Sequence, residues 1–297
     1  MSSLVATIIG HPARRVLTPD VANSARAALG ASSLDWLADG IACDIALPDG
    51  ADAAASEQML RDLLAGLAVD IAVQEAATRR KALLVADMDS TMIDQECIDE
   101  LADEAGVKAY VAAITARSMN GEIAFEPALR ERVGLLKDLP LTVIDKVLGE
   151  RITLASGGKA LIATMRANGA WTALVSGGFT AFTGPVAAML GFDENQANTL
   201  LQADDRLTGT VAEPILGREA KAEALKRICA ARGIGLSQSI AVGDGANDLD
   251  MLTLAGTGVA LHAKPAVAAQ ARIRIDHGDL TALLYLQGYH ESDFVTA

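Results

Sequence analysis

Hydrophobic residues in the first 80 positions follow two different spacings. Four apolar runs have the length of β-strands, at residues 4–9, 34–37, 41–47 and 69–73. Two other stretches carry apolar side chains every three to four positions, the spacing of a helix, at residues 18–29 and 56–67. The order βαββαβ predicts a small ferredoxin-like α+β domain over residues 1–80.

Turn and capping residues support these elements. Thr18 can cap the first helix, with Pro19 at the first helical position. The dipeptide Asp39-Gly40 is typical of a tight hairpin and lies between the second and third apolar runs. The basic residues at 79–81 mark the expected joint to a second domain.

From residue 81 onward, uninterrupted apolar runs alternate with helical stretches. The runs lie at residues 82–86, 171–175, 240–242 and 259–261, and clear helices at 159–167 and 219–231. Such runs are typical of strands buried on both faces, so we expect residues 81–297 to form a Rossmann-like α/β domain with a parallel sheet. Residues 95–153 show helical periodicity alone, which predicts a helical cap inserted after the first strand.

The composition narrows the classes of function. The 297 residues include 25 Lys and Arg against 38 Asp and Glu, and this net charge of -13 argues against a nucleic-acid-binding surface. No apolar run approaches the ~18 residues of a membrane helix, and residues 1–10 lack the basic leader of a signal peptide. The cysteines Cys43, Cys97 and Cys229 are odd in number and far apart, which favours a reducing compartment. We therefore expect a cytoplasmic protein without nucleic-acid or membrane partners.

Two acidic clusters carry the strongest chemical signal. Asp87 and Asp89 follow the apolar run 82–86, and Asp244 and Asp248 follow the run 240–242. Ligands of open α/β sheets bind at the carboxyl ends of the strands, where these acids are expected. Neighbouring carboxylates repel one another unless a cation or a proton lies between them, and Mg²⁺ prefers such oxygen ligands. Each cluster alone could be an exposed turn or a helix cap, but two at the same sheet edge predict a magnesium site.

Two further segments give weaker evidence of a phosphate-binding site. Ser176-Gly177-Gly178-Phe179 follows the run 171–175, and a hydroxyl followed by backbone amides before a helix can hold phosphate oxygens. Lys221 lies on the expected helix 219–231, but the pattern does not separate it from Lys226 or Arg218.

Together, the four ordered motifs resemble the haloacid dehalogenase (HAD) superfamily of phosphotransferases. The segments Asp87-Met-Asp-Ser-Thr, Ser176-Gly-Gly-Phe and Gly243-Asp-Gly-Ala-Asn-Asp are similar to those of its phosphoserine phosphatase family. The helical insert resembles the cap of that superfamily. The first 80 residues resemble an ACT-type amino-acid-binding domain in element order only, which suggests an amino-acid effector.

The resemblance implies a mechanism. Asp87 would be the nucleophile that forms an aspartyl-phosphate, and Asp89 the general acid and base. Mg²⁺ would lie on Asp87, Asp244 and the backbone carbonyl of Asp89, with Asp248 either near the metal or orienting Lys221. The function implied is hydrolysis of O-phospho-L-serine, the last step of serine biosynthesis.

The resemblance also implies the substrate contacts. Lys221, the Ser176 hydroxyl, the Gly177 amide and Asn247 would contact the phosphate. In the cap, Glu96 would pair with the substrate ammonium, and Arg132 with its carboxylate. Without the resemblance, Glu96 and Arg132 would be interpreted as a surface ion pair. Further candidates are two apolar walls that could equally belong to the core of the cap, Met119 and Phe125.

Three alternatives stay open at this stage. Another HAD enzyme could act on phosphothreonine or a sugar phosphate, or transfer the phosphoryl group to an acceptor such as homoserine. A serine-sensing regulatory protein with a vestigial phosphatase half is a second interpretation, and a nucleic-acid 3′-phosphatase is disfavoured by the acidic charge. The assembly is not fixed by the sequence, and a homodimer is one option.

Overall fold

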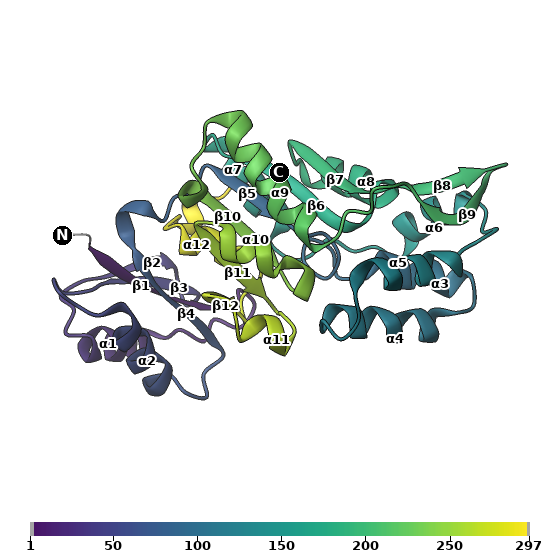
Figure 1. The fold of residues 1–297 in the computed structure, drawn as a ribbon. Helices are drawn as coiled ribbons and strands as arrows, with labels where there is room; N and C mark the ends of the chain where they lie inside the picture. The colour runs from purple at the N-terminus through teal and green to yellow at the C-terminus, as the bar shows by residue number, and fades with distance from the viewer. Residues whose placement is uncertain (1–2, 296–297) are drawn as a thin grey trace.

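The computed structural model describes residues 3–295, with a small antiparallel sheet at the N-terminus and a larger parallel sheet beside it (Figure 1). The N-terminal elements occur in the expected order: β1 (Leu4–Gly10), α1 (Pro19–Ala28), β2 (Leu34–Ala38), β3 (Ala42–Ala46), α2 (Ala53–Leu63) and β4 (Val69–Glu75). The strands are arranged β2-β3-β1-β4, with α1 and α2 on one face (Figure 1). The expected βαββαβ arrangement is confirmed.

Local chemistry explains where the first two helices begin. Thr18 caps α1, since its Oγ1 accepts a hydrogen bond from the Val21 amide at 3.3 Å. The boundaries expected for α2, 56–67, were wrong by several residues at both ends. Asp52 caps this helix by accepting from the Ala55 amide at 2.7 Å, and the alanines after it are strong helix formers.

The larger sheet has six parallel strands within the described residues, in the order β12-β11-β10-β5-β6-β7. Their bounds are β5 (Leu83–Ala86), β6 (Trp171–Phe179), β7 (Glu194–Asn198), β10 (Ser239–Gly243), β11 (Thr257–Leu261) and β12 (Ile273–Ile275). The central strands are buried on both faces, because alternate residues of β5 join two different hydrophobic clusters. The expected parallel α/β sheet is confirmed.

Helices cover both faces of this sheet. Their bounds are α7 (Gly158–Ala167), α8 (Thr180–Leu190), α9 (Arg218–Arg232), α10 (Leu249–Leu254), α11 (Pro265–Ala268) and α12 (Ala282–Leu286). Leu84 and Ala86 share a cluster with α7, α8 and α12, while Leu83 and Val85 share one with α9 and α10. Among residues 3–295, no helix has both the length and the apolar character needed to cross a membrane.

Four helices form an insert between β5 and α7: α3 (Cys97–Glu104), α4 (Lys108–Met119), α5 (Phe125–Gly134) and α6 (Thr142–Glu150). The two ends of this insert lie side by side, because Ile93 and Leu154 form an antiparallel bridge. A hairpin that the sequence pattern did not indicate, β8 (Leu200–Ala203) and β9 (Arg206–Val211), packs against α5. Short 3₁₀ helices complete the chain at Ala76–Thr78, Leu236–Gln238, Ala246–Asp248 and Glu291–Asp293.

Candidate active site

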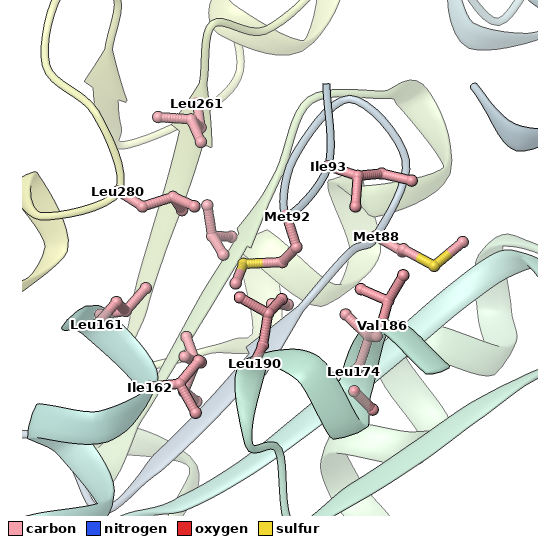
Figure 2. Close-up of a cluster of buried hydrophobic side chains, with 14 of the residues drawn as sticks. Met88, Met92, Ile93, Leu161, Ile162, Leu174, Val186, Leu190, Leu261 and Leu280 are labelled. Carbon is pink, nitrogen blue, oxygen red and sulfur yellow. The ribbon is translucent and has the colours of Figure 1, made fainter. Parts of the chain in front are cut away.

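The acidic motifs meet because their strands are neighbours. Asp87 follows β5 and Asp244 follows β10, which is paired with β5, while Ser176 lies near the end of β6 on the other side of β5. Between the two aspartates, the buried Met88 side chain points into the apolar cluster beside Val186 of α8 and Ile93 (Figure 2). Side chains alternate along extended backbone, so Asp87 and Asp89, which line one cavity, lie on the side opposite Met88.

Lys221 links the two acidic clusters. Its ammonium lies 2.7 Å from Asp87 Oδ1 and 2.6 Å from Asp248 Oδ1. Lys221 is buried on the inner face of α9, whereas Lys226 on the same helix is exposed. Burial alone would lower the pKa of Lys221, but Asp248 and Asp87 outweigh it and raise the pKa, so the ammonium stays charged.

Asp248 is held by the backbone at the end of β10. The Gly245 amide donates to Asp248 Oδ2 at 3.0 Å. A Cβ at Gly243 would lie 2.3 Å from the Asp248 carboxyl carbon, so the close approach of this side chain to the strand requires glycine there. Asp248 contacts Lys221 and also belongs to a cluster of three carboxylates, so both roles expected for it stay predictions.

Three carboxylates could hold a divalent cation. Asp87, Asp244 and Asp248 each offer an oxygen within 4.8 Å of the others. Burial raises the pKa of Asp244 well above its usual value, and Asp248 and Asp87 raise it further. Burial likewise raises the pKa of Asp87 to about 7, with Asp248 adding to the effect and Lys221 opposing it. One ammonium among three carboxylates leaves excess negative charge, which fits a hard cation such as Mg²⁺.

Asp89 lies where a proton could be exchanged with the contents of the cavity. Its Oδ1 accepts from the Cys97 amide at 2.9 Å, and its Oδ2 lies 3.5 Å from Ser176 Oγ. Burial raises its pKa, which favours the protonated acid. The Cys97 thiol is buried and burial raises its pKa well above the usual value, so it is not a nucleophilic thiolate.

A cavity of about 270 Å³ lies between the sheet edge and the helical insert. On the sheet side it is lined by Asp87, Asp89 and the segment 176–179. On the helical side it is lined by Glu96 and Arg132 among others. The structure therefore brings the catalytic and substrate-binding candidates to one cavity, while Lys221, Asp244 and Asp248 are buried beside Asp87.

Glu96 and Arg132 are separate features of this wall rather than a surface ion pair. Glu96 accepts from the Ser90 hydroxyl at 2.6 Å, and burial followed by the charge of Asp89 raises its pKa well above the usual value. Arg132 is 5% exposed, donates to Thr115 Oγ1 at 3.0 Å, and has a pKa lowered by burial. Thr115 in turn donates to Asp99 Oδ1 at 2.7 Å, which fixes the hydroxyl that orients Arg132.

One of the two apolar candidates, Phe125, forms part of the cavity wall. Phe125 begins α5 and lines the cavity, and a Cβ at Gly177 would lie 2.9 Å from its ring. The ring therefore rests directly on the segment expected to hold phosphate. Asn247 also lines the cavity. Met119 ends α4, but its side chain lies outside the described part of the structure.

Sequence reasoning missed Asn198 and gave Arg218 no role of its own. Asn198 is 2% exposed and donates to the Gly177 carbonyl at 2.8 Å, while its Oδ1 accepts from the Leu216 amide at 2.7 Å. It thus fixes the position of the Gly177 peptide. Asn198 ends the edge strand β7, whose residues are mostly polar, so no apolar pattern predicted this strand. Arg218 lines the cavity and pairs with Asp250. Neither residue belongs to a short motif.

Comparison with known proteins agrees with this geometry. The model of the haloacid dehalogenase-like hydrolase family matches residues 84–253. A phosphoserine phosphatase from Streptomyces coelicolor is 42% identical over 290 residues, which are 96% of this chain and 70% of that protein. The similarity therefore extends beyond the catalytic motifs into the N-terminal sheet.

Solved structures give the same result. A structure described as a phospho-aspartyl intermediate analogue of phosphoserine phosphatase is 42% identical, with a TM-score of 0.67, and the match covers 69% of this chain and 98% of that one. A HAD family hydrolase from Salmonella enterica serovar Typhi is 29% identical, with a TM-score of 0.84, and the match covers 96% and 98% of the two chains.

Proposed function

The chain belongs to the phosphoserine phosphatase family of the haloacid dehalogenase-like hydrolases, and on that premise we propose that it hydrolyses O-phospho-L-serine to L-serine and phosphate, the last step of serine biosynthesis. One observation carries this proposal: the nucleophile and the substrate-binding candidates line the same cavity. Asp87, which contacts Lys221, lies on one wall, and Glu96 and Arg132 lie on the opposite wall.

In the first step, Asp87 attacks phosphorus. Asp87 Oδ1 accepts from the Met88 amide at 2.7 Å and from Lys221, which holds the carboxylate fixed as its other oxygen forms the new O–P bond. The bond from phosphorus to the serine oxygen breaks as the aspartyl-phosphate forms. The 42% identical phosphoserine phosphatase that was solved as a phospho-aspartyl intermediate analogue supports this assignment.

Asp89 moves the protons in both steps. Its raised pKa favours the acid form, which protonates the departing serine oxygen. The resulting carboxylate then accepts a proton from water as the water oxygen attacks phosphorus. The Asp87–phosphorus bond breaks, phosphate is released, and Asp89 is again protonated.

The remaining groups hold the substrate. The Ser176 hydroxyl, the Gly177 amide and Lys221 would bind phosphoryl oxygens, and Asn247 would add a polar contact. In the cap, the Arg132 guanidinium would bind the substrate carboxylate and Glu96 the ammonium. Phe125 would exclude water, and Met119 stays a candidate from sequence alone.

The donor set fits Mg²⁺. Asp87, Asp244 and the Asp89 carbonyl would hold the ion, with Asp248 close by, and Mg²⁺ would supply charge that stabilises the phosphoryl oxygens. Lys221 opposes the rise in the pKa of Asp87, and the Gly245 amide, just after β10, holds Asp248 at the site.

The decisive experiment measures phosphate release from L-phosphoserine with and without Mg²⁺, against phosphothreonine, a sugar phosphate and an aryl phosphate. Asp87→Asn should abolish release while circular dichroism stays unchanged. Asp94→Asn, an exposed acid near the same motif, is the matched control and should retain full activity. Turnover by Asp87→Asn, or preference for another phosphoester, would refute the proposal.

We also propose a domain organisation, a cellular location and an assembly for this enzyme. Residues 1–80 would form an ACT-like regulatory domain with an amino-acid effector, and residues 81–297 the phosphatase domain with its cap at 95–153. All three cysteines are free thiols, which supports the cytoplasmic location expected from the sequence. Sedimentation with and without serine tests both the homodimer and the effector.

A further inference from the structure

The N-terminal sheet makes a directed contact with the catalytic domain through one buried carboxylate. Asp70 on β4 is 4% exposed and points to the loop that follows β12. Its Oδ1 accepts from the Asp276 amide at 2.7 Å, and its Oδ2 accepts from the Gly278 amide at 2.7 Å. The His277 amide lies 3.1 Å from Oδ2 and 3.2 Å from Oδ1. One side chain therefore fixes three successive amides of the other domain.

The loop 276–278 is fixed in turn to His262. The His262 ring nitrogen Nε2 lies 2.8 Å from the Gly278 carbonyl, and because a carbonyl only accepts, Nε2 must carry the proton. The His262 amide donates to the Ile275 carbonyl at 2.8 Å. His262 has φ of 44°, a conformation that non-glycine residues adopt only when their surroundings hold them in it.

Two residues later, the same segment reaches the proposed metal site. The Lys264 amide donates to the Asp244 carbonyl at 3.1 Å, and the Lys264 ammonium lies 3.9 Å from Asp244 Oδ2. Lys264 thus contacts Asp244 at both its backbone and its side chain. The segment 262–264 is therefore held at one end by the loop 276–278 and at the other by Asp244.

We propose that Asp70 is a positioning residue for the metal-binding carboxylate Asp244, acting through the loop 276–278, His262 and Lys264. The N-terminal unit then contributes to catalysis without any ligand bound to it. This inference rests on the proposed function, because it concerns the affinity for Mg²⁺ at Asp244. Asp70 itself contacts neither substrate nor metal.

The test uses the full chain and the variant Asp70→Asn. Asparagine has the same shape, but its NH₂ group must face at least one of the amide donors, so one or more of these bonds is lost. We expect the Mg²⁺ concentration for half-maximal phosphate release to rise by about threefold to tenfold. We also expect the Mg²⁺-induced rise in Tm to need more Mg²⁺ by a similar factor, which is a readout independent of turnover.

The matched control is Gln74→Met. Gln74 lies four residues further along β4 and donates to the Leu286 carbonyl at 2.5 Å, so it joins the same two domains without touching the loop 276–278. Its Mg²⁺ dependence should stay within about twofold of the unmodified chain, a change small enough to separate from the effect at Asp70. An equal shift in both variants would overturn the proposal, because loosened domain packing would then explain it.

A second variant acts on the other end of the path. His262→Asn keeps a residue that tolerates positive φ but is too short to reach the Gly278 carbonyl. It should reproduce the Asp70→Asn shift, and the double variant should be no weaker than the weaker single variant, because both break one path in series. Additive shifts would overturn the proposal, and so would a change confined to KM for the phosphoester.

Hydrogen exchange separates this idea from the proposed function. Amides of residues 276–278 and 262–264 should exchange faster in Asp70→Asn and keep their protection in Gln74→Met. Loss of protection confined to 276–278 would overturn the path, even if the chain hydrolyses phosphoserine. If the unmodified chain shows no Mg²⁺-dependent turnover, the proposed function fails, while the exchange and Tm measurements still decide whether Asp70 influences Asp244.

Discussion

Replacement of Lys221 by Met tests the central electrostatic arrangement. The change removes the ammonium and keeps a side chain of similar length, so Asp87 and Asp248 lose a contact of 2.7 Å and one of 2.6 Å. At these distances each attraction is roughly 6 kcal/mol at an effective dielectric constant of about 20, before the cost of burying the ammonium is subtracted. Removing one partner of a buried pair destabilises proteins by about 3–5 kcal/mol, which is our expectation here.

The loss of stability should depend on pH in a defined direction. Lys221 lowers the pKa of Asp87, so in the variant this pKa rises above its value of about 7, far above the 3.8 of an unfolded aspartate. Folding then favours the protonated acid, and the variant loses stability as the pH rises from about 4 through 7 and beyond. The deficit should therefore be larger at pH 8 than at pH 5.

The assay is thermal unfolding followed by circular dichroism, together with phosphate release. Tm should fall by roughly 6–10 °C at pH 8. Turnover should fall by about 10²- to 10³-fold, the usual effect of removing one donor to a developing charge. Lys226→Met, an exposed position on the same helix, should change neither quantity. A Tm within about 2 °C of the unmodified chain at pH 8 would contradict the 3–5 kcal/mol expected of the buried contacts.

Three other changes test separate parts of the structure. Gly177→Ala would place a Cβ 2.9 Å from the Phe125 ring, so kcat/KM should fall by about tenfold, and Phe125→Leu should restore part of it. Arg132→Met should lower kcat/KM for phosphoserine by roughly 10²-fold and affect an aryl phosphate far less; equal losses would show a structural role. Arg79→Met removes the cation that lies 2.5 Å from the buried carboxylate of Asp44, whose pKa is raised by burial. The free energy of unfolding in urea should fall by about 1–3 kcal/mol, and by more at pH 8 than at pH 5.

The site was predictable where the sequence carries a local pattern. Asp87 and Asp244 each follow a short apolar run in a fully buried strand, because a strand between two helical layers has no solvent-facing side. Their proximity then follows from the rule that ligands bind at the carboxyl ends of parallel strands. The spacing of apolar residues likewise predicted the order of strands and helices in the N-terminal domain.

Features without such a pattern were not predictable. The edge strand β7 has the sequence Glu-Asn-Gln-Ala-Asn. Because most of these side chains are polar, the strand lacks the apolar alternation from which strands are predicted. The choice of Lys221 over Lys226 depends on which face of α9 meets the sheet. The orientation of Arg132 depends on Thr115 and Asp99, which lie on other helices of the insert. These are tertiary relations, and no local spacing records them.

The balance of charge in the cavity connects the metal, the proton and the substrate. Five carboxylates surround or underlie it: Asp87, Asp89, Glu96, Asp244 and Asp248. A phosphoester is itself anionic, so it would be repelled unless positive charge or protons are added. The raised pKa of Asp89 provides a proton, and the trio around Lys221 provides oxygen ligands for a cation. A cation bound to these carboxylates would offset the negative charge that repels the phosphoester, and it would attract the phosphoester directly. The metal and the phosphoester are therefore each expected to strengthen the binding of the other, by the same factor.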